Sequence, residues 1–314
     1  MLNKQKIAII GLGMVGSSIA FSLMQEGIFS EIVLIDKDRK KAKGEAMDLS
    51  HGIPFCESIN IYEGDYDDIK DCYVVIITAG ANQEKGETRL DLIDKNLKIY
   101  KSIIPNITKT SFEGILLVVS NPVDILTYVT LKLSGYDKKR VIGSGTVLDS
   151  ARFQYMLGRH LNVDSKSIHA FIIGEHGDSE LAVWDSSDIG GMKINNFCEL
   201  RGHFNHEQAM NEIFSGVKNS AYEIIERKGA TYYGIAMAVK RICTALVKDE
   251  HSILPVSSYI DGEYGLNDIC ISIPSIVCME GIDKVLEIPL SKREDENLFN
   301  SASKLKDVLE SLKL

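Results

Sequence analysis

The chain lacks the features that mark secreted and membrane proteins. Its six cysteines form no CxxC pair and no Cys/His cluster at metal-ligand spacing, which predicts reduced thiols and no metal site. Residues 1–6 lead directly into an apolar strand without a signal-peptide core. No apolar run approaches the roughly 18 residues that span a membrane. We therefore expect a cytoplasmic protein with no membrane partner.

Positive charge is also scarce. Lys and Arg number 35 against 44 Asp and Glu, which gives a net charge of -9 over 314 residues. The basic residues are scattered, which disfavours a nucleic-acid partner and leaves anionic substrates dependent on specifically placed arginines. Low-complexity linkers and internal repeats are missing too, so we expect two units that share a tight interface.

The first part of the chain alternates short apolar runs with helical patterns. Strands are predicted at 6–10, 31–36, 73–77 and 115–119, with helices after the first strand and at 89–104. This alternation predicts an α/β fold, in which parallel strands joined by right-handed crossovers form a doubly wound sheet. We assign it to residues 1–147.

The pattern changes after about residue 147. Helices are predicted at 150–161, 206–228 and 231–248, and short strands around 168–173, 253–260 and 269–274. Residues 261–265 form a hairpin turn signal between the last two strands. A charged segment at about 291–312 is typical of a solvated outer helix. Residues 148–314 are therefore predicted to form an α+β substrate-binding domain.

A glycine-rich turn, Gly11-Leu12-Gly13-Met14-Val15-Gly16, follows the first strand and opens a helix. Gly11 allows a tight turn, Gly13 lets the backbone approach a pyrophosphate, and Gly16 lets helix and strand pack closely. Asp36 ends the next strand, where it would bind a ribose diol and repel a 2′-phosphate. The pattern indicates a Rossmann site for NAD, although Asp36 alone could cap a turn before the basic run 37–43.

A second group of residues carries acid/base chemistry. His176 lies in Gly174-Glu175-His176-Gly177, and Asp149 and Arg152 lie three residues apart, on one face of a predicted helix. One histidine, an acid that orients it and a guanidinium that holds a carboxylate can move a proton on a small carboxylic acid. Taken singly, the glycines around His176 are also typical of a plain tight turn. The spacing of Asp149 and Arg152 more often indicates a surface salt bridge.

Four segments, 79–90, 119–124, 148–152 and 174–179, together resemble the lactate/malate dehydrogenase family, and the match runs in order from residue 7 to about residue 235. The resemblance implies an NAD-dependent oxidoreductase of glycolysis and fermentation that oxidises a 2-hydroxy acid. The alternative from another class is a dinucleotide-binding regulator or redox sensor without turnover, which would not need His176, Asp149 and Arg152 together.

The resemblance also implies roles for single residues. His176 matches the catalytic acid/base, Asp149 the carboxylate that orients it and raises its pKa, and Arg89 the arginine that polarises the reacting carbonyl when the loop 83–89 closes. The implied substrate-binding residues are Gln83, Arg89, Asn121, Asp124, Arg152 and Thr231; unaided, Thr231 would be interpreted as a helix N-cap. The implied cofactor-binding residues are Gly11, Gly13, Met14, Val15, Gly16, Asp36, Lys41, Tyr66, Gly80, Ala81, Ser102, Val119, Ser120, Asn121 and Ser144.

Gln83 distinguishes the two branches of the family. A malate enzyme must neutralise a second carboxylate, which the family does with an arginine at this position, because an unpaired charge in a closed site is costly. A neutral glutamine leaves a dicarboxylate unmatched. The residue therefore favours lactate and pyruvate over malate and oxaloacetate, which remain the alternative.

The resemblance implies an oligomer, and we expect a homotetramer. Many bacterial members bind fructose bisphosphate between subunits through an arginine and a histidine. His169 matches the histidine, but Gln154 stands at the arginine position. Loss of one cation weakens a phosphate site strongly, so we expect little or no activation, with His169 left as a possible interface residue.

Overall fold

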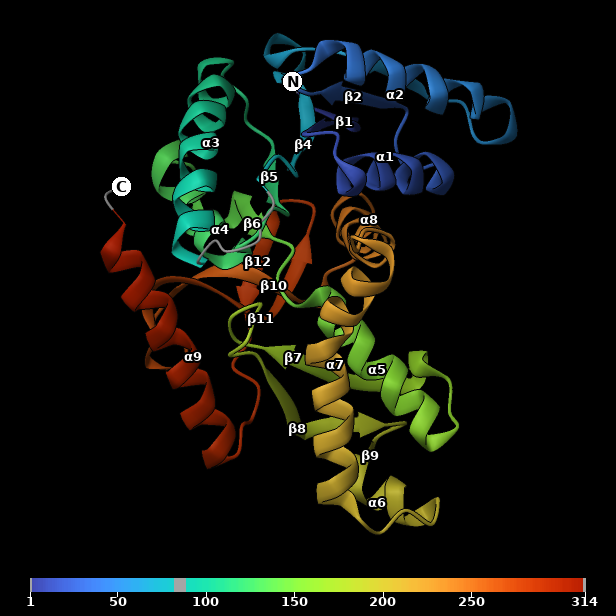
Figure 1. The fold of residues 1–314 in the computed structure, drawn as a ribbon, viewed down its shortest axis with the longest axis vertical. Helices are drawn as coiled ribbons and strands as arrows, with labels where there is room; N and C mark the ends of the chain where they lie inside the picture. Colours follow the sequence, from blue (N-terminus) through green and yellow to red (C-terminus); the bar gives the residue numbers. More distant parts are fainter. Residues whose placement is uncertain (1, 82–88, 313–314) are drawn as a thin grey trace.

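A large mixed sheet forms the centre of the protein (Figure 1). The structure is a computed structural model that describes residues 2–81 and 89–312. The strands of this sheet are β1 (Asn3–Ile10), β2 (Glu31–Ile35), β3 (Asn60–Glu63), β4 (Cys72–Ile77), β5 (Ile115–Val118), β6 (Val141–Gly143), β10 (Ser252–Asp261), β11 (Asn267–Cys278) and β12 (Gly281–Val285). Their order in the sheet is β12-β11-β10-β6-β5-β4-β1-β2-β3.

The parallel part of the sheet runs β3-β2-β1-β4-β5-β6, which is the strand order of a doubly wound Rossmann fold. Its crossover helices are α1 (Met14–Glu26), α2 (Arg39–His51), α3 (Arg89–Lys109) and α4 (Val123–Ser134). The predicted α/β class is thereby confirmed. Helix α3 continues beyond the predicted end at residue 104, because the fully buried Ile107 extends its apolar stripe.

Strands β10, β11 and β12 extend this sheet in the antiparallel sense. The sequence pattern places the first two in the second unit, but β10 pairs with β6 through Ser257 and Gly143. This pairing covers the edge that β6 would otherwise present to solvent. The predicted turn at 261–265 does join β10 to β11, through a single 3-10 turn, Glu263–Gly265.

A second, smaller sheet contains β7 (Ile168–Ile173), β8 (Leu181–Ile189) and β9 (Met192–Lys193). Helices α5 (Val147–Leu161), α6 (Ile194–Leu200) and α7 (His206–Lys228) gather around it in the lower part of Figure 1. This sheet has a core of its own, where the rings of Phe153 and Trp184 meet edge to face at 4.8 Å. Helix α8 (Tyr233–Val247) then returns to the first unit and packs against α1.

Helix α9 (Lys292–Ser311), predicted as a solvated outer helix, is exposed on one face only. Most of its charged residues are exposed, while Leu298, Leu305 and the acid Glu294 are buried on the other face. The buried carboxylate of Glu294 accepts hydrogen bonds from the backbone N–H groups of Trp184 and Asp185, at 2.7 and 3.2 Å. The helix is therefore fastened to β8.

Two further observations concern the cysteines and the helices. All six cysteines are free thiols, and all but Cys56 are buried. Among the described residues, no helix is both long enough and apolar enough to cross a membrane.

Candidate active site

The turn after β7 presents His176 to the first turn of α5. Gly174, at φ +94°, reverses the chain in a conformation that favours glycine. His176 Nδ1 then lies 2.6 Å from Asp149 Oδ2, although the two residues are 27 positions apart. Because an ionised carboxylate can only accept, the imidazole donates through Nδ1 and presents Nε2 on its other side.

Arg152 binds the other oxygen of the same carboxylate. Its Nη1 donates to Asp149 Oδ1 at 2.7 Å, and the Asp149 side chain is only 4% exposed. The pair is thus a salt bridge within one helix, but a buried one rather than the surface bridge that this spacing usually indicates. Within residues 2–81 and 89–312, this is the one hydrogen bond of the guanidinium, so its other N–H groups are available to a second anion.

This network shifts the pKa of both titrating partners. Burial favours the neutral carboxyl of Asp149, but His176 and Arg152 outweigh it and hold the pKa of Asp149 below its usual range. Burial likewise opposes a charge on His176, but the Asp149 carboxylate outweighs it, with help from Glu180 and Asp124, and raises the pKa of His176 to about 9. The histidine therefore holds its proton through neutral pH.

Sequence reasoning missed Glu180, which is 7% exposed and directly precedes β8. One of its oxygens, one Asp149 oxygen and a His176 ring nitrogen lie within 4.8 Å of one another. Such a triplet is compact enough for a cation, but both Asp149 oxygens already accept from His176 and Arg152, so the cluster is better suited to sharing protons. The only available signal was an acid four residues after the histidine.

Asp124, at the start of α4, contacts the turn that carries His176. It is 2% exposed, and its Oδ2 accepts a hydrogen bond from the backbone N–H of His176 at 2.8 Å. Ser272 donates to its Oδ1 at 3.1 Å and also forms a backbone bridge with Gly174. Burial raises the pKa of Asp124. The carboxylate predicted to bind substrate is thus bonded to the backbone that carries His176.

Helix α9 also forms hydrogen bonds with the turn that carries His176. The fully buried hydroxyl of Ser301 accepts from the backbone N–H of Glu175 at 2.8 Å and lies 3.0 Å from the Ser179 hydroxyl. Ser179 in turn donates to the Glu175 carboxylate. The turn that carries the histidine is therefore anchored to β11, α4 and α9.

For the other predicted substrate residues, the structure gives the position and exposure of two and does not describe the side chains of the rest. Asn121 is exposed at the end of β5, and Thr231 is half-buried between Gly229, which ends α7, and Tyr232. Tyr232, not Thr231, is the N-cap of α8, and it makes no side-chain cap. Gln83 and the side chain of Arg89 lie outside the described residues.

The glycine turn between β1 and α1 is closely packed at two of its three glycines. A Cβ on Gly11 would lie 2.5 Å from the Ala79 nitrogen, and one on Gly16 would lie 2.0 Å from the Gly11 carbonyl oxygen. A Cβ on Gly13, in contrast, would meet nothing within 4 Å. Gly13 is also the N-cap of α1 and makes no side-chain cap, so open space adjoins the unpaired N–H groups of the helix.

Asp36 closes this turn from the end of β2. Its Oδ2 accepts from the Leu12 N–H at 2.7 Å, and its Oδ1 accepts from the Asp38 N–H at 3.0 Å. The cap of α2 is Asp38, which leaves Asp36 free of that role. A carboxylate has further lone pairs for a ribose diol, so an open helix N-terminus and an adjacent acid fit a dinucleotide.

Two further strand ends meet beside this turn. The buried amide of Asn96, which sequence reasoning missed, accepts from the Ala81 N–H and donates to the Asn121 carbonyl, both at 2.7 Å. Ser120 donates to the Ala79 carbonyl at 2.7 Å. The predicted cofactor residues at the ends of β4 and β5 are therefore tied to one another.

The remaining predicted cofactor residues are more dispersed. Val119 and Ser144 are buried at the ends of β5 and β6, Val15 is half-buried, and Met14 and Gly80 are exposed. Tyr66 is half-buried at the start of a short 3-10 helix (Tyr66–Ile69), and Lys41 is exposed on α2. Ser102 is exposed on α3 and donates to the Ile99 carbonyl of its own helix. The roles of Tyr66, Lys41 and Ser102 stay predictions.

The two positions predicted for an activator site are close in space. Gln154, on α5, donates through Nε2 to the carbonyl of Ala170 at 3.1 Å. His169 precedes that alanine on β7 and is exposed. The glutamine amide is thus bonded to the strand that carries His169.

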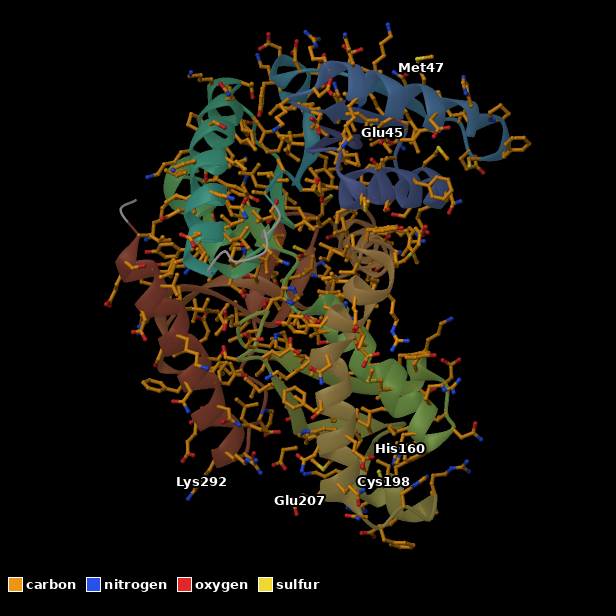
Figure 2. All side chains as sticks on the ribbon, viewed as in Figure 1. Glu45, Met47, His160, Cys198, Glu207 and Lys292 are labelled. Atoms are coloured by element: carbon orange, nitrogen blue, oxygen red, sulfur yellow. The ribbon has the colours of Figure 1, made fainter. Side chains whose placement is uncertain are left out.

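Another histidine pair shows a different environment. His160 lies near Cys198 in the lower part of Figure 2, and its ring centroid is 4.4 Å from that of His203. Burial and the neighbouring His203 lower the pKa of His160. Among the residues that the structure describes, no carboxylate forms a hydrogen bond with this ring as Asp149 does with His176, so His160 favours the neutral form.

Comparison with known proteins gives matches along nearly the whole chain. Residues 5–143 match the lactate/malate dehydrogenase NAD binding domain, and residues 146–313 match the alpha/beta C-terminal domain of the same family. L-lactate dehydrogenase 1 of Clostridium acetobutylicum is 52% identical over 312 residues, which cover 99% of this chain and 100% of that protein. L-lactate dehydrogenase of Acetivibrio thermocellus is 51% identical, with 98% and 97% covered.

Solved structures agree with these matches. The ligands-bound form of the minor L-lactate dehydrogenase from Enterococcus mundtii has a TM-score of 0.96 at 43% identity, with 99% of each chain covered. Its ligands-unbound form has a TM-score of 0.92 at 41% identity, with 100% of this chain and 99% of that chain covered. Sequence, fold and site geometry lead to one conclusion, that this chain belongs to the lactate/malate dehydrogenase family.

Proposed function

We propose that this protein is an NAD-dependent L-lactate dehydrogenase, which interconverts L-lactate and pyruvate in glycolysis and fermentation. The observation that carries the proposal is the buried network of His176, Asp149 and Arg152. A dinucleotide-binding regulator without turnover has no use for this network. The relatives at about 50% identity bear the same activity in their names.

The reaction moves a hydride and a proton separately. NAD, when bound, supplies the hydride exchange with C2 of the acid. In lactate oxidation, His176 Nε2 accepts the hydroxyl proton as the carbon gives up its hydride. In pyruvate reduction, the same nitrogen returns the proton to the carbonyl oxygen. Asp149 fixes the tautomer through Nδ1 and stabilises the imidazolium.

Substrate is held by residues around this histidine. Arg152 binds the substrate carboxylate with donors that Asp149 does not use, in a planar contact that lysine cannot reproduce. Arg89 polarises the reacting carbonyl, while Asn121 and Thr231 line the site. Asp124 acts through its bond to the His176 N–H, because its two oxygens are already used by protein donors.

The carboxyl ends of the parallel strands would hold the cofactor. The open space at Gly13 and the N-terminus of α1 would accommodate the pyrophosphate, and Asp36 would accept hydrogen bonds from the ribose hydroxyls. The negative charge of Asp36 disfavours a 2′-phosphate, so NAD is preferred over NADP.

Gln83 selects the acid. A neutral side chain at this loop position leaves a second substrate carboxylate without a partner, so lactate and pyruvate are preferred over malate and oxaloacetate. This assignment depends on the resemblance and on residue type, since Gln83 lies outside the described residues.

The assembly and its regulation are further parts of the proposal. We propose a cytoplasmic homotetramer in which residues 1–147 bind the cofactor and residues 148–314 complete the substrate site. Gln154 offers a neutral amide, already bonded to Ala170, where an activator phosphate needs a cation. Titrating fructose bisphosphate against pyruvate saturation tests this point, and a large fall in half-saturation at micromolar activator would contradict it.

Oxidation of reduced nicotinamide, followed by absorbance, tests the function. Pyruvate should be reduced much faster than oxaloacetate, and NADH should be preferred to NADPH. His176→Ala should abolish turnover while NADH binding survives. Near-full activity of that variant would refute the mechanism, and a wild-type preference for oxaloacetate would refute the substrate assignment.

A further inference from the structure

Glu180 is a charged group of the active site that the proposed mechanism does not use. Its side chain is buried, and one of its oxygens lies within 4.8 Å of an Asp149 oxygen and a His176 ring nitrogen. A second carboxylate so close to an ionised one is unfavourable in a buried site unless a cation or a proton compensates it. The imidazole of His176 is close enough to provide either.

Charged groups from several elements face this pair. Within the described part of the chain they are Asp149 and Arg152 from α5, Asp124 from α4 and Lys218 from α7. Asp149 is paired with Arg152, and Asp124 is bonded to the His176 backbone rather than to its ring. The Lys218 ammonium donates to the carbonyl of Asp178, at 2.6 Å.

The proton balance of the cluster therefore depends on His176 and Glu180. One proton shared between them gives either an imidazolium beside a carboxylate or a neutral imidazole beside a carboxylic acid. Burial and the Asp149 carboxylate raise the pKa of Glu180 to about 8, below the pKa of about 9 at His176, so the carboxylate of Glu180 faces the imidazolium above about pH 8. Groups this close titrate as a coupled pair, so removing one changes the other.

We propose that Glu180 is a positioning residue that acts through His176, as the second counter-charge of the imidazolium beside Asp149. This inference rests on the proposed function and deepens it. Above about pH 8, where Glu180 is ionised, transfer of the His176 Nε2 proton to the substrate oxygen removes a neighbouring positive charge from Glu180, which then takes up a proton from solvent. In the reverse direction, Glu180 releases that proton as His176 becomes charged. The buried site thereby avoids two uncompensated carboxylates.

The test compares Glu180→Gln with the wild-type protein. The pKa of His176 is measured by NMR titration of labelled histidine without substrate, and its signal is assigned by its loss in His176→Gln. Removing the carboxylate should lower this pKa by about 1 pH unit. The pH profiles of kcat/KM in both directions should move downward by the same amount, which a merely structural role would not cause.

Asp185→Asn provides the matched control, because it removes the same charge from an exposed position five residues away on β8. It should leave the pKa of His176 and the pH profiles unchanged. Glu180→Asp retains a carboxylate and should bring the pKa of His176 part of the way back to the wild-type value.

An unchanged pKa of His176 in Glu180→Gln, or an equal shift in Asp185→Asn, would overturn the proposal. If Glu180→Gln does not fold, Glu180→Ala takes its place, and an unchanged pKa of His176 in Glu180→Ala would do the same. The titration needs no turnover, so a wild-type protein that fails to reduce pyruvate refutes the proposed function without altering this result.

Discussion

Asp124 and His176 are joined by a hydrogen bond from the His176 backbone N–H to Asp124 Oδ2, 2.8 Å long and closed across 52 residues of sequence. The bond joins the turn that carries His176, which connects β7 and β8 of the smaller sheet, to a helix of the nucleotide-binding fold. The position of the catalytic histidine thus depends on both units.

Removing this bond should damage both stability and catalysis. Asp124→Ala leaves a buried N–H unpaired, which costs about 1–3 kcal/mol of unfolding free energy. The shifted turn should lower kcat roughly 100-fold. Ser272→Ala removes only one bond to Asp124 and should have a smaller effect on both quantities. Chemical denaturation and steady-state kinetics measure them, and equal effects of the two variants would contradict the assigned role.

The raised pKa of His176 sets the pH dependence of the two directions. Because the imidazolium persists up to about pH 9, pyruvate reduction should decline as pH rises through that value, and lactate oxidation should increase. The same shift contributes stability that is complete below about pH 6.5, the ordinary histidine pKa, and is lost as pH rises through about 9. A flat profile between pH 7 and 10 in both directions would be inconsistent with this pKa.

Asp149→Asn should distinguish the effect of the Asp149 charge on His176 from the effect of the contact between the two side chains. The amide can keep a contact with the ring but not the negative charge, so the pKa of His176 should fall toward about 6.5. The wrong tautomer and the less stable imidazolium should lower kcat by about 10²- to 10⁴-fold. Kinetics over a pH series measures both effects, and an unshifted profile would show that Asp149 does not set the pKa.

The glycine turn allows folding to be separated from cofactor binding. Gly13→Ala places a methyl group in open space, so stability should be unchanged, but NADH affinity should fall about tenfold if the pyrophosphate passes there. Gly16→Ala forces a Cβ against the Gly11 carbonyl and should destabilise the fold by about 1–3 kcal/mol. NADH fluorescence titration and thermal unfolding distinguish the two effects. An undiminished affinity of Gly13→Ala for NADH would show that the pyrophosphate does not pass beside Gly13.

Gln83→Arg tests the substrate assignment. An arginine at this position supplies the missing partner of a second carboxylate, so the ratio of kcat/KM for oxaloacetate to that for pyruvate should rise by at least about tenfold. Steady-state kinetics with both acids measures the ratio. No gain would show that another residue selects the acid.

Lys6, on β1, provides a prediction about stability alone. Its side chain is 8% exposed, and its ammonium pairs with Asp71 at 2.8 Å and Glu31 at 3.2 Å. Lys6→Met keeps the apolar stem but removes the cation from both acids and leaves Glu31 with the hydrogen bond from the Tyr62 hydroxyl. The loss should cost roughly 1–3 kcal/mol, less than for a fully buried pair, because the acids are partly solvated. Arg227→Met, which breaks an exposed pair with Glu223, should cost about 0.3–0.5 kcal/mol. Denaturant unfolding that finds equal costs would contradict the role of burial.

The sequence by itself determined the local elements and the chemical type of the site. The alternation of apolar runs and helical patterns, the glycines of residues 11–16 and the acid at Asp36 each act over a short span, so the doubly wound sheet and its cofactor could be predicted. The residue types at His176, Asp149 and Arg152 indicated acid/base chemistry on a small carboxylic acid, and the resemblance to the family implied the role of each residue.

Only the tertiary structure decided which distant groups meet. Strands β10 and β11 join the main sheet, and α9 buries Glu294 against β8, because edge coverage and buried hydrogen bonds depend on packing that no local pattern encodes. Asn96, Asp124 and Glu180 have ordinary sequence contexts, and their importance comes from burial beside partners far along the chain. The pKa of His176 is likewise a property of the assembled cluster, since it depends on charges that folding brings together.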